Sequence, residues 1–183
     1  MPDYRRANVT GGTYFFTVAT HRRQPLLTHD DVRQALREGI RKAKERFPFK
    51  IDAWVLLPDH LHCIWTLPEG DADFSARWGM IKRYVSQQCA ARYCHSQRSS
   101  ASRVRRMEAG LWQRRFWEHQ IRDDEDYRRH VDYIHWNPVK HGYARHVKDW
   151  PYSTFHRFVS EGHYPPDGGG GEVSLDTDDS FGE

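Results

Sequence analysis

Two histidines separated by one residue are the clearest candidates for chemistry in this chain. His60 and His62 lie in an apolar segment that predicts a strand. Side chains at i and i+2 of a strand project from one face, about 7 Å apart, so both imidazoles could bind one metal ion. Leu61 and Cys63 would then face a helix-covered core, with Cys63 as a small buried hydrophobe rather than a ligand. Because the chain has 12 histidines, two unrelated surface histidines remain the alternative.

A second pair of polar side chains lies near the end of a predicted helix. Tyr133 and Asn137 are four residues apart and are therefore neighbours on one helix face. The expected core stripe contains Tyr127, Val131 and Ile134, and Tyr133 lies about a third of a turn from its centre. Tyr133 is thus placed to line a site, although packing at the helix edge is the alternative. The Asn137 carbonyl could complete a metal shell, and oxygen plus imidazole donors favour Mg²⁺ or Mn²⁺.

The elements that position these residues follow from the hydrophobic pattern. Runs of branched and aromatic residues predict strands at residues 13–18, 51–57, 61–67 and 116–122. Aspartates that can cap a helix predict three helix starts, at residues 30–31, 71–73 and 123–126. Pro48 and Pro138 are expected to end the first and third helices. The order β-α-β-β-α-β plus one helix predicts a ferredoxin-like α+β sandwich, with helices on one face of an antiparallel sheet. The other face would be free for a ligand.

Charge divides the chain into two parts. Residues 161–183 carry seven acidic side chains and no Lys or Arg, and their glycines predict a disordered tail. Residues 1–160 carry 28 basic and 18 acidic side chains, a net charge of +10, and are expected to form one domain that binds a polyanion. The Ser/Arg-rich residues 96–109 predict a loop. Three cysteines without a CxxC pair, and no apolar run of membrane-spanning length, favour a cytoplasmic protein with no membrane partner.

Several ordered blocks resemble a known family, the single-tyrosine transposases with a His-hydrophobic-His signature. Residues 54–65 (WVLLPDHLHCIW) match that signature, and residues 111–119 (LWQRRFWEH) and 133–142 (YIHWNPVKHG) match its C-terminal blocks. Residues 11–17 and 149–156 are similar to the branch called REP-associated tyrosine transposases. The resemblance covers about residues 4–165.

This resemblance implies an activity and a substrate. His60, His62 and Asn137 would hold a divalent metal, Mg²⁺ or Mn²⁺, and Tyr133 would attack the scissile phosphate. The products would be a 5′-phosphotyrosine and a free 3′-OH, and reverse attack would rejoin strands without ATP. The implied partner is a single-stranded DNA hairpin, the repetitive extragenic palindrome with an adjacent foot. A monomer that acts at the bacterial nucleoid is expected.

Charge and aromatic character indicate the DNA contacts. Phosphates are expected to meet the basic stretch 77–115, which contains Arg77, Lys82, Arg83, Arg92, Arg98, Arg103, Arg105, Arg106, Arg114 and Arg115. Unstacked bases need aromatic or Arg platforms, for which the candidates are Arg5, Arg6, Tyr14, Trp112 and Trp117. Core packing is the alternative for both tryptophans, and a solvated terminus for both arginines.

Two other functions remain open at this point. A non-catalytic nucleic-acid binder on the same fold would bind hairpins in EDTA and form no covalent adduct. A hydrolase that uses His60 and His62 to activate water would not need Tyr133. Neither alternative explains why Tyr133 and Asn137 share a helix face.

Overall fold

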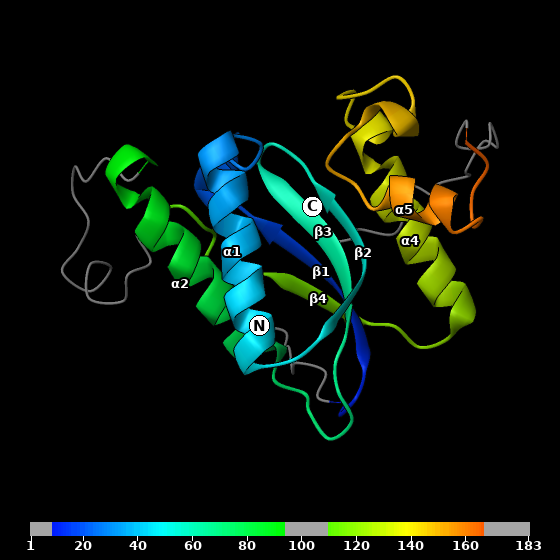
Figure 1. The fold of residues 1–183 in the computed structure, drawn as a ribbon, viewed down its shortest axis with the longest axis horizontal. Coiled ribbons are helices and arrows are strands. Elements are labelled where there is room, and N and C mark those ends of the chain that lie inside the picture. The colour runs from blue at the N-terminus through cyan, green and yellow to red at the C-terminus, as the bar shows by residue number, and fades with distance from the viewer. Residues whose placement is uncertain (1–8, 94–109, 167–183) are drawn as a thin grey trace, which may run out of the picture.

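A four-stranded antiparallel sheet forms the centre of the computed structural model, which describes residues 9–93 and 110–166 (Figure 1). The strands are β1 (Thr13–Ala19), β2 (Lys50–Leu56), β3 (His60–Thr66) and β4 (Trp117–Gln120). They lie in the order β2-β3-β1-β4, which confirms the ferredoxin-like prediction. Arg5, Arg6, the Ser/Arg-rich segment 96–109 and residues 167–183 of the acidic tail lie outside the described residues.

Two long helices cover one face of the sheet, α1 (Asp30–Arg46) and α2 (Phe74–Tyr93). Leu61, Cys63 and Trp65 of β3 pack beneath them, and the Trp65 ring stacks on Trp78 at 4.2 Å between centroids. Strand alternation therefore sends the even-numbered residues of β3 to the opposite face, as predicted. Within the described ranges, no helix is long and apolar enough to cross a membrane.

The starts of these two helices differ in their capping. The predicted cap at Asp30 or Asp31 is wrong, because His29 precedes the first turn of α1 and both aspartates lie inside that turn. Negative charge is favourable there, at the positive end of the helix dipole. Asp73 does cap α2, since its Oδ1 accepts a hydrogen bond from the Ala76 N–H at 2.9 Å.

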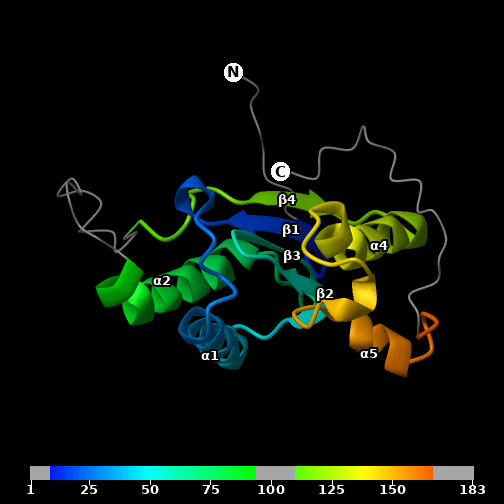
Figure 2. The same cartoon turned by 90° about the horizontal axis from the view of Figure 1, so that it is seen from above.

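The helix α4 (Asp124–Lys140) covers the face of the sheet that the ferredoxin-like layout leaves open (Figure 2). Val131 and Ile134 pack on that face, and Asp123 caps the helix by accepting a 2.8 Å hydrogen bond from the Asp126 N–H. The predicted end at Pro138 is wrong, because Pro138 lies within the last turn. A proline costs one N–H there, but the helix continues only two residues further.

The C-terminal segment packs back on the body, as its aromatic residues predicted. It contains η2 (Val147–Asp149) and α5 (Phe155–Ser160). The Trp150 indole donates a 3.0 Å hydrogen bond to the Leu56 carbonyl, and Thr154 bonds both backbone groups of Trp54. Tyr164, inside the range assigned to the tail, donates a hydrogen bond to Asp132 of α4. Packed structure thus extends past residue 160.

Candidate active site

The two histidines of β3 lie side by side under α4. Their ring centroids are 4.9 Å apart, and both side chains are almost fully buried. His60 Nδ1 lies 2.7 Å from the Asp59 carboxylate, and His62 Nδ1 lies 2.9 Å from the Thr17 hydroxyl. These contacts fix both ring orientations and leave Nε2 as the nitrogen for coordination, the arrangement that partners of metal-bound histidines provide.

Tyr133 and Asn137 reach the same place from α4. The Tyr133 ring lies 5.2 Å from the His62 ring and 6.0 Å from Phe15, which itself stacks on His62 at 5.4 Å. Asn137, one turn later, is fully buried, including its carbonyl oxygen Oδ1. The i, i+4 spacing on α4 and the i, i+2 spacing on β3 therefore place four polar side chains between sheet and helix.

Burial tests whether this donor set fits a metal. His60 Nε2 is buried and has no hydrogen-bond partner among the described residues, which costs free energy unless something binds it. His62 Nε2 and Asn137 Oδ1 are also inaccessible to water. Two neutral imidazoles and an amide oxygen are suitable donors for Mn²⁺ or Mg²⁺. The residues present fit a divalent ion.

Four further residues of the site were not predicted from the sequence. The Lys140 ammonium lies 3.5 Å from Tyr133 Oη and 4.9 Å from the ring centroid. The His141 ring lies 5.2 Å from His60. Asp59 and Thr17 orient the histidines, as described above. Lys140 had a signal, because a residue seven after Tyr133 lies two turns away on the same helix face.

Two predicted DNA contacts are wrong because the side chains are buried. Arg77 is 0% exposed, and its guanidinium donates to the Asp71 carboxylate and to the carbonyls of Phe47, Pro48 and Asp73. No donor direction is left for a phosphate. Tyr14 is also 0% exposed; its ring packs in the core and its hydroxyl donates to the Val9 carbonyl.

The other predicted contacts within the described ranges lie nearer the surface. Arg83, Arg114 and Arg115 are exposed. The Lys82 ammonium donates a 2.6 Å hydrogen bond to the Gln113 carbonyl, which brings α2 next to the segment that precedes β4. Trp112 and Trp117 are half-buried and pack against the core. We call Lys82, Arg83, Arg114 and Arg115 the basic patch.

Comparison with known proteins decides the family. The family model described as "Transposase IS200 like" matches residues 8–137. A REP-associated tyrosine transposase of Escherichia coli K12 is 51% identical over 171 residues, covering 93% of this chain and 92% of the relative. The chain belongs to the IS200-like transposases.

Two further relatives place it in the REP-associated tyrosine branch. A putative REP-associated tyrosine transposase of Haemophilus influenzae is 43% identical over 170 residues, with 93% of this chain and 94% of the relative covered. A solved REP-associated tyrosine transposase bound to a REP hairpin superposes with a TM-score of 0.82 at 50% identity. That alignment covers all of this chain and 98% of the solved one. The buried His, Tyr and Asn side chains therefore lie in a transposase.

Proposed function

We propose that this transposase nicks and rejoins single-stranded DNA at repetitive extragenic palindrome hairpins, through a covalent 5′-phosphotyrosine on Tyr133. His60, His62 and Asn137 would hold the divalent metal that the reaction needs. The observation that carries the proposal is the convergence of the tyrosine of α4 on the histidine pair of β3, with a lysine at the phenol oxygen.

The surroundings of Tyr133 suit a nucleophile. Its ring is held between His62, Phe15 and the Lys140 side chain, so Oη has little freedom before attack. A free phenol has a pKa near 10 and must lose its proton to react. The ammonium of Lys140, 3.5 Å from Oη, favours the phenolate over the neutral phenol. Lys140 thus supports the ionised form of the nucleophile.

The three ligands come from two elements that the fold holds rigidly together. His60 and His62 are kept in orientation by Asp59 and Thr17, and Asn137 by its place in α4. A bound divalent ion supplies charge neutralisation and orientation at a non-bridging oxygen of the scissile phosphate. Because His60 Nε2 is buried without a hydrogen-bond partner among the described residues, a bound ion would also relieve the free-energy cost of that unsatisfied lone pair.

The reaction conserves the number of phosphate ester bonds. Tyr133 Oη loses its proton and forms a bond to phosphorus, while the bond from phosphorus to the 3′ oxygen breaks. That oxygen takes up a proton and leaves as a free 3′-OH, and the 5′ side remains on the tyrosine. An incoming 3′-OH can reverse the exchange, because no phosphodiester has been hydrolysed. This reversibility is what transposition requires.

The DNA partner is inferred from the relatives and from surface charge. The solved relative was bound to a REP hairpin, and it aligns with the whole of this chain. We infer that the basic patch contacts hairpin phosphates and that the exposed ring surfaces of Trp112 and Trp117 stack with unpaired bases. The active-site side chains meet within one protein chain, which supports a monomer acting in cis.

The test is nicking of an end-labelled single-stranded hairpin with Mn²⁺ or Mg²⁺. Wild type should cut, whereas Tyr133→Phe and wild type in EDTA should bind the hairpin without cutting it. Tyr127→Phe is the matched control, since it removes a hydroxyl from a half-buried tyrosine of the same helix and should cut normally. Cutting by Tyr133→Phe would instead favour a hydrolase, and binding without cutting by wild type would favour a binding module.

A further inference from the structure

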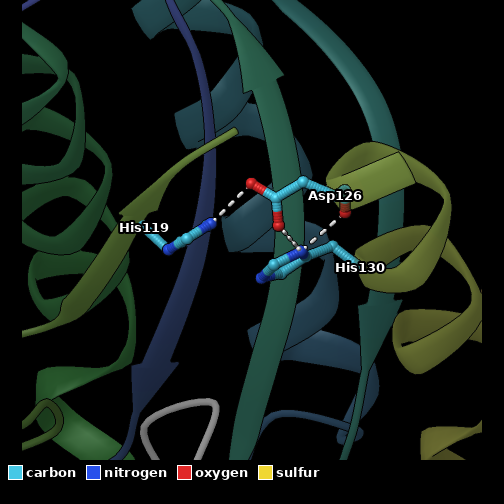
Figure 3. A group of neighbouring side chains, drawn as sticks. All are labelled: His119, Asp126 and His130. Atoms are coloured by element: carbon cyan, nitrogen blue, oxygen red, sulfur yellow. Dashed lines mark hydrogen bonds and ion pairs between the residues drawn. The ribbon is translucent and has the colours of Figure 1, made fainter. Parts of the chain in front are cut away.

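A second group of ligating side chains lies outside the active site. His119 of β4 and Asp126 and His130 of α4 place one ligand atom each within 4.8 Å of one another. The Asp126 carboxylate lies between the two imidazoles, 2.8 Å from His119 Nε2 and 3.0 Å from His130 Nδ1 (Figure 3). The two rings are nearly parallel, with centroids 4.6 Å apart. Donors from a strand and a helix thus converge on one point.

This group is separate from the candidate active site. Phe15 lies between them, with its ring centroid 4.8 Å from His130 and 5.4 Å from His62. None of its three residues was predicted to act, because the contact between β4 and the start of α4 is a tertiary feature. His119 and Asp126 keep side-chain exposures of 23% and 17%, so an ion could reach them from solvent.

We propose that His119, Asp126 and His130 form a second metal site, which binds a zinc ion and joins β4 to α4. Two imidazoles and a carboxylate are a donor set that zinc uses, with water as the fourth ligand. Ligands about 2.0–2.1 Å from tetrahedral zinc lie roughly 3.3 Å from each other. The 2.8 and 3.0 Å separations, which involve the two different oxygens of Asp126, would open by a few tenths of an ångström, and no two ligand atoms of the group are more than 4.8 Å apart.

The ligand atom of His130 also contacts the backbone. His130 Nδ1 lies 2.8 Å from the Asp126 backbone carbonyl, one turn earlier on α4, as well as 3.0 Å from the Asp126 carboxylate. A carbonyl oxygen only accepts hydrogen bonds, so this contact places a proton on Nδ1 in the metal-free protein. Zinc binding through Nδ1 would release that proton and replace the hydrogen bond to the carbonyl.

Such an ion would fix the start of the catalytic helix. Asp126 accepts a hydrogen bond from the Arg122 backbone, and His130 is one turn before Tyr133 on α4. His119 is on β4, which is an edge strand among the described strands and pairs with β1. Metal binding would therefore couple the edge strand to the helix that carries the nucleophile.

The experiment counts zinc sites without using DNA. The double variant His60→Ala/His62→Ala removes the active-site ligands and serves as the background. In that background, metal-free protein is titrated with zinc against a colorimetric chelator, and cobalt absorption reports the coordination geometry. His119→Ala is compared with His146→Ala, which removes an exposed histidine that is not part of the group. Asp126→Asn is a second variant that keeps a hydrogen-bond acceptor, and circular dichroism in EDTA confirms folding.

The background should bind one zinc ion, give a tetrahedral cobalt spectrum, and gain about 5 °C in Tm at zinc well above its Kd. His146→Ala should leave all three unchanged. His119→Ala and Asp126→Asn should each lower the affinity for zinc at least tenfold while keeping the metal-free fold. A background protein that binds no zinc at micromolar concentration would overturn the proposal, as would equal zinc affinity in His119→Ala and His146→Ala.

Discussion

Replacing Arg77 by alanine should destabilise the fold and leave each folded molecule able to bind DNA. The guanidinium is fully buried and donates five hydrogen bonds, two to Asp71 and three to backbone carbonyls. Breaking a buried charge pair costs about 3–5 kcal/mol. The Asp71 side chain is 31% exposed, so water replaces part of what it loses, and the lower end of that range, about 3 kcal/mol, is expected.

Arg83→Ala is the matched control on the same helix. Arg83 is exposed, so its loss should change the free energy of unfolding by less than about 0.5 kcal/mol. As a proposed phosphate contact, it should lower the slope of log affinity against log salt by about 0.7–0.9. The two arginines are predicted to give opposite results, one in stability and the other in salt dependence.

The assay combines thermal and urea unfolding, each followed by circular dichroism, with hairpin binding at several salt concentrations. Arg77→Ala should lower Tm by about 6–12 °C, and its salt slope should equal that of wild type below its unfolding temperature. If Arg77→Ala kept wild-type stability and its slope of log affinity against log salt fell by the amount of one phosphate contact, the assignment of Arg77 to the core would be refuted.

Three further predictions follow from contacts in the same structure. The hydrogen bond from Arg77 lowers the pKa of Asp71, so the ionised carboxylate stabilises the fold above about pH 4, and that contribution is lost as pH falls through the lowered pKa. The free energy of unfolding of Asp71→Asn should therefore fall less steeply with acid than that of wild type. An equal dependence on pH would count against the pairing. Lys140→Met should reduce nicking about tenfold at pH 7 and shift the pH–rate profile to higher pH, because the Tyr133 phenolate loses a nearby cation, and an unchanged profile would argue against this role. Thr17→Val removes the hydroxyl at His62 Nδ1 and should weaken Mn²⁺ binding at least tenfold by calorimetry, with no change expected if the orientation of that ring is immaterial.

Local periodicity was sufficient to predict the histidine pair and its direction. Alternation along β3 separates His60 and His62 from Leu61 and Cys63, and this needs no knowledge of the rest of the chain. The predicted i, i+4 relation of Tyr133 to Asn137 is also present in the structure, because both residues lie in α4 and helix geometry fixes it. What periodicity could not give was that α4 lies on the histidine face, since that depends on which sheet face the first two helices leave uncovered.

Charge was a poorer guide than periodicity. Arg77 was assigned to DNA because it lies in a basic stretch, yet it follows Phe74 by three residues and precedes Trp78, so it belongs to the core stripe of α2. Tyr14 was assigned to base stacking because it is aromatic, but β1 is an inner strand with both faces covered. In both cases, position in the element decides the role and residue type does not.

Tertiary contacts account for the residues that no pattern predicted. His119 and His130 are eleven residues apart and meet only because β4 turns back into α4. Asp59, in the turn between β2 and β3, contacts His60 as a direct neighbour, but its role depends on that ring being buried. Burial of a polar group becomes visible only once the packing is known.

The central claim is most directly tested by mapping the covalent adduct. Wild-type protein is incubated with a labelled single-stranded hairpin and Mn²⁺, digested with protease, and analysed by mass spectrometry. The account predicts a peptide with the 5′ end of the cut strand linked to Tyr133, absent in EDTA and in Tyr133→Phe. A cut strand with a free 5′ phosphate and no linked peptide, or DNA attached to another tyrosine, would contradict it.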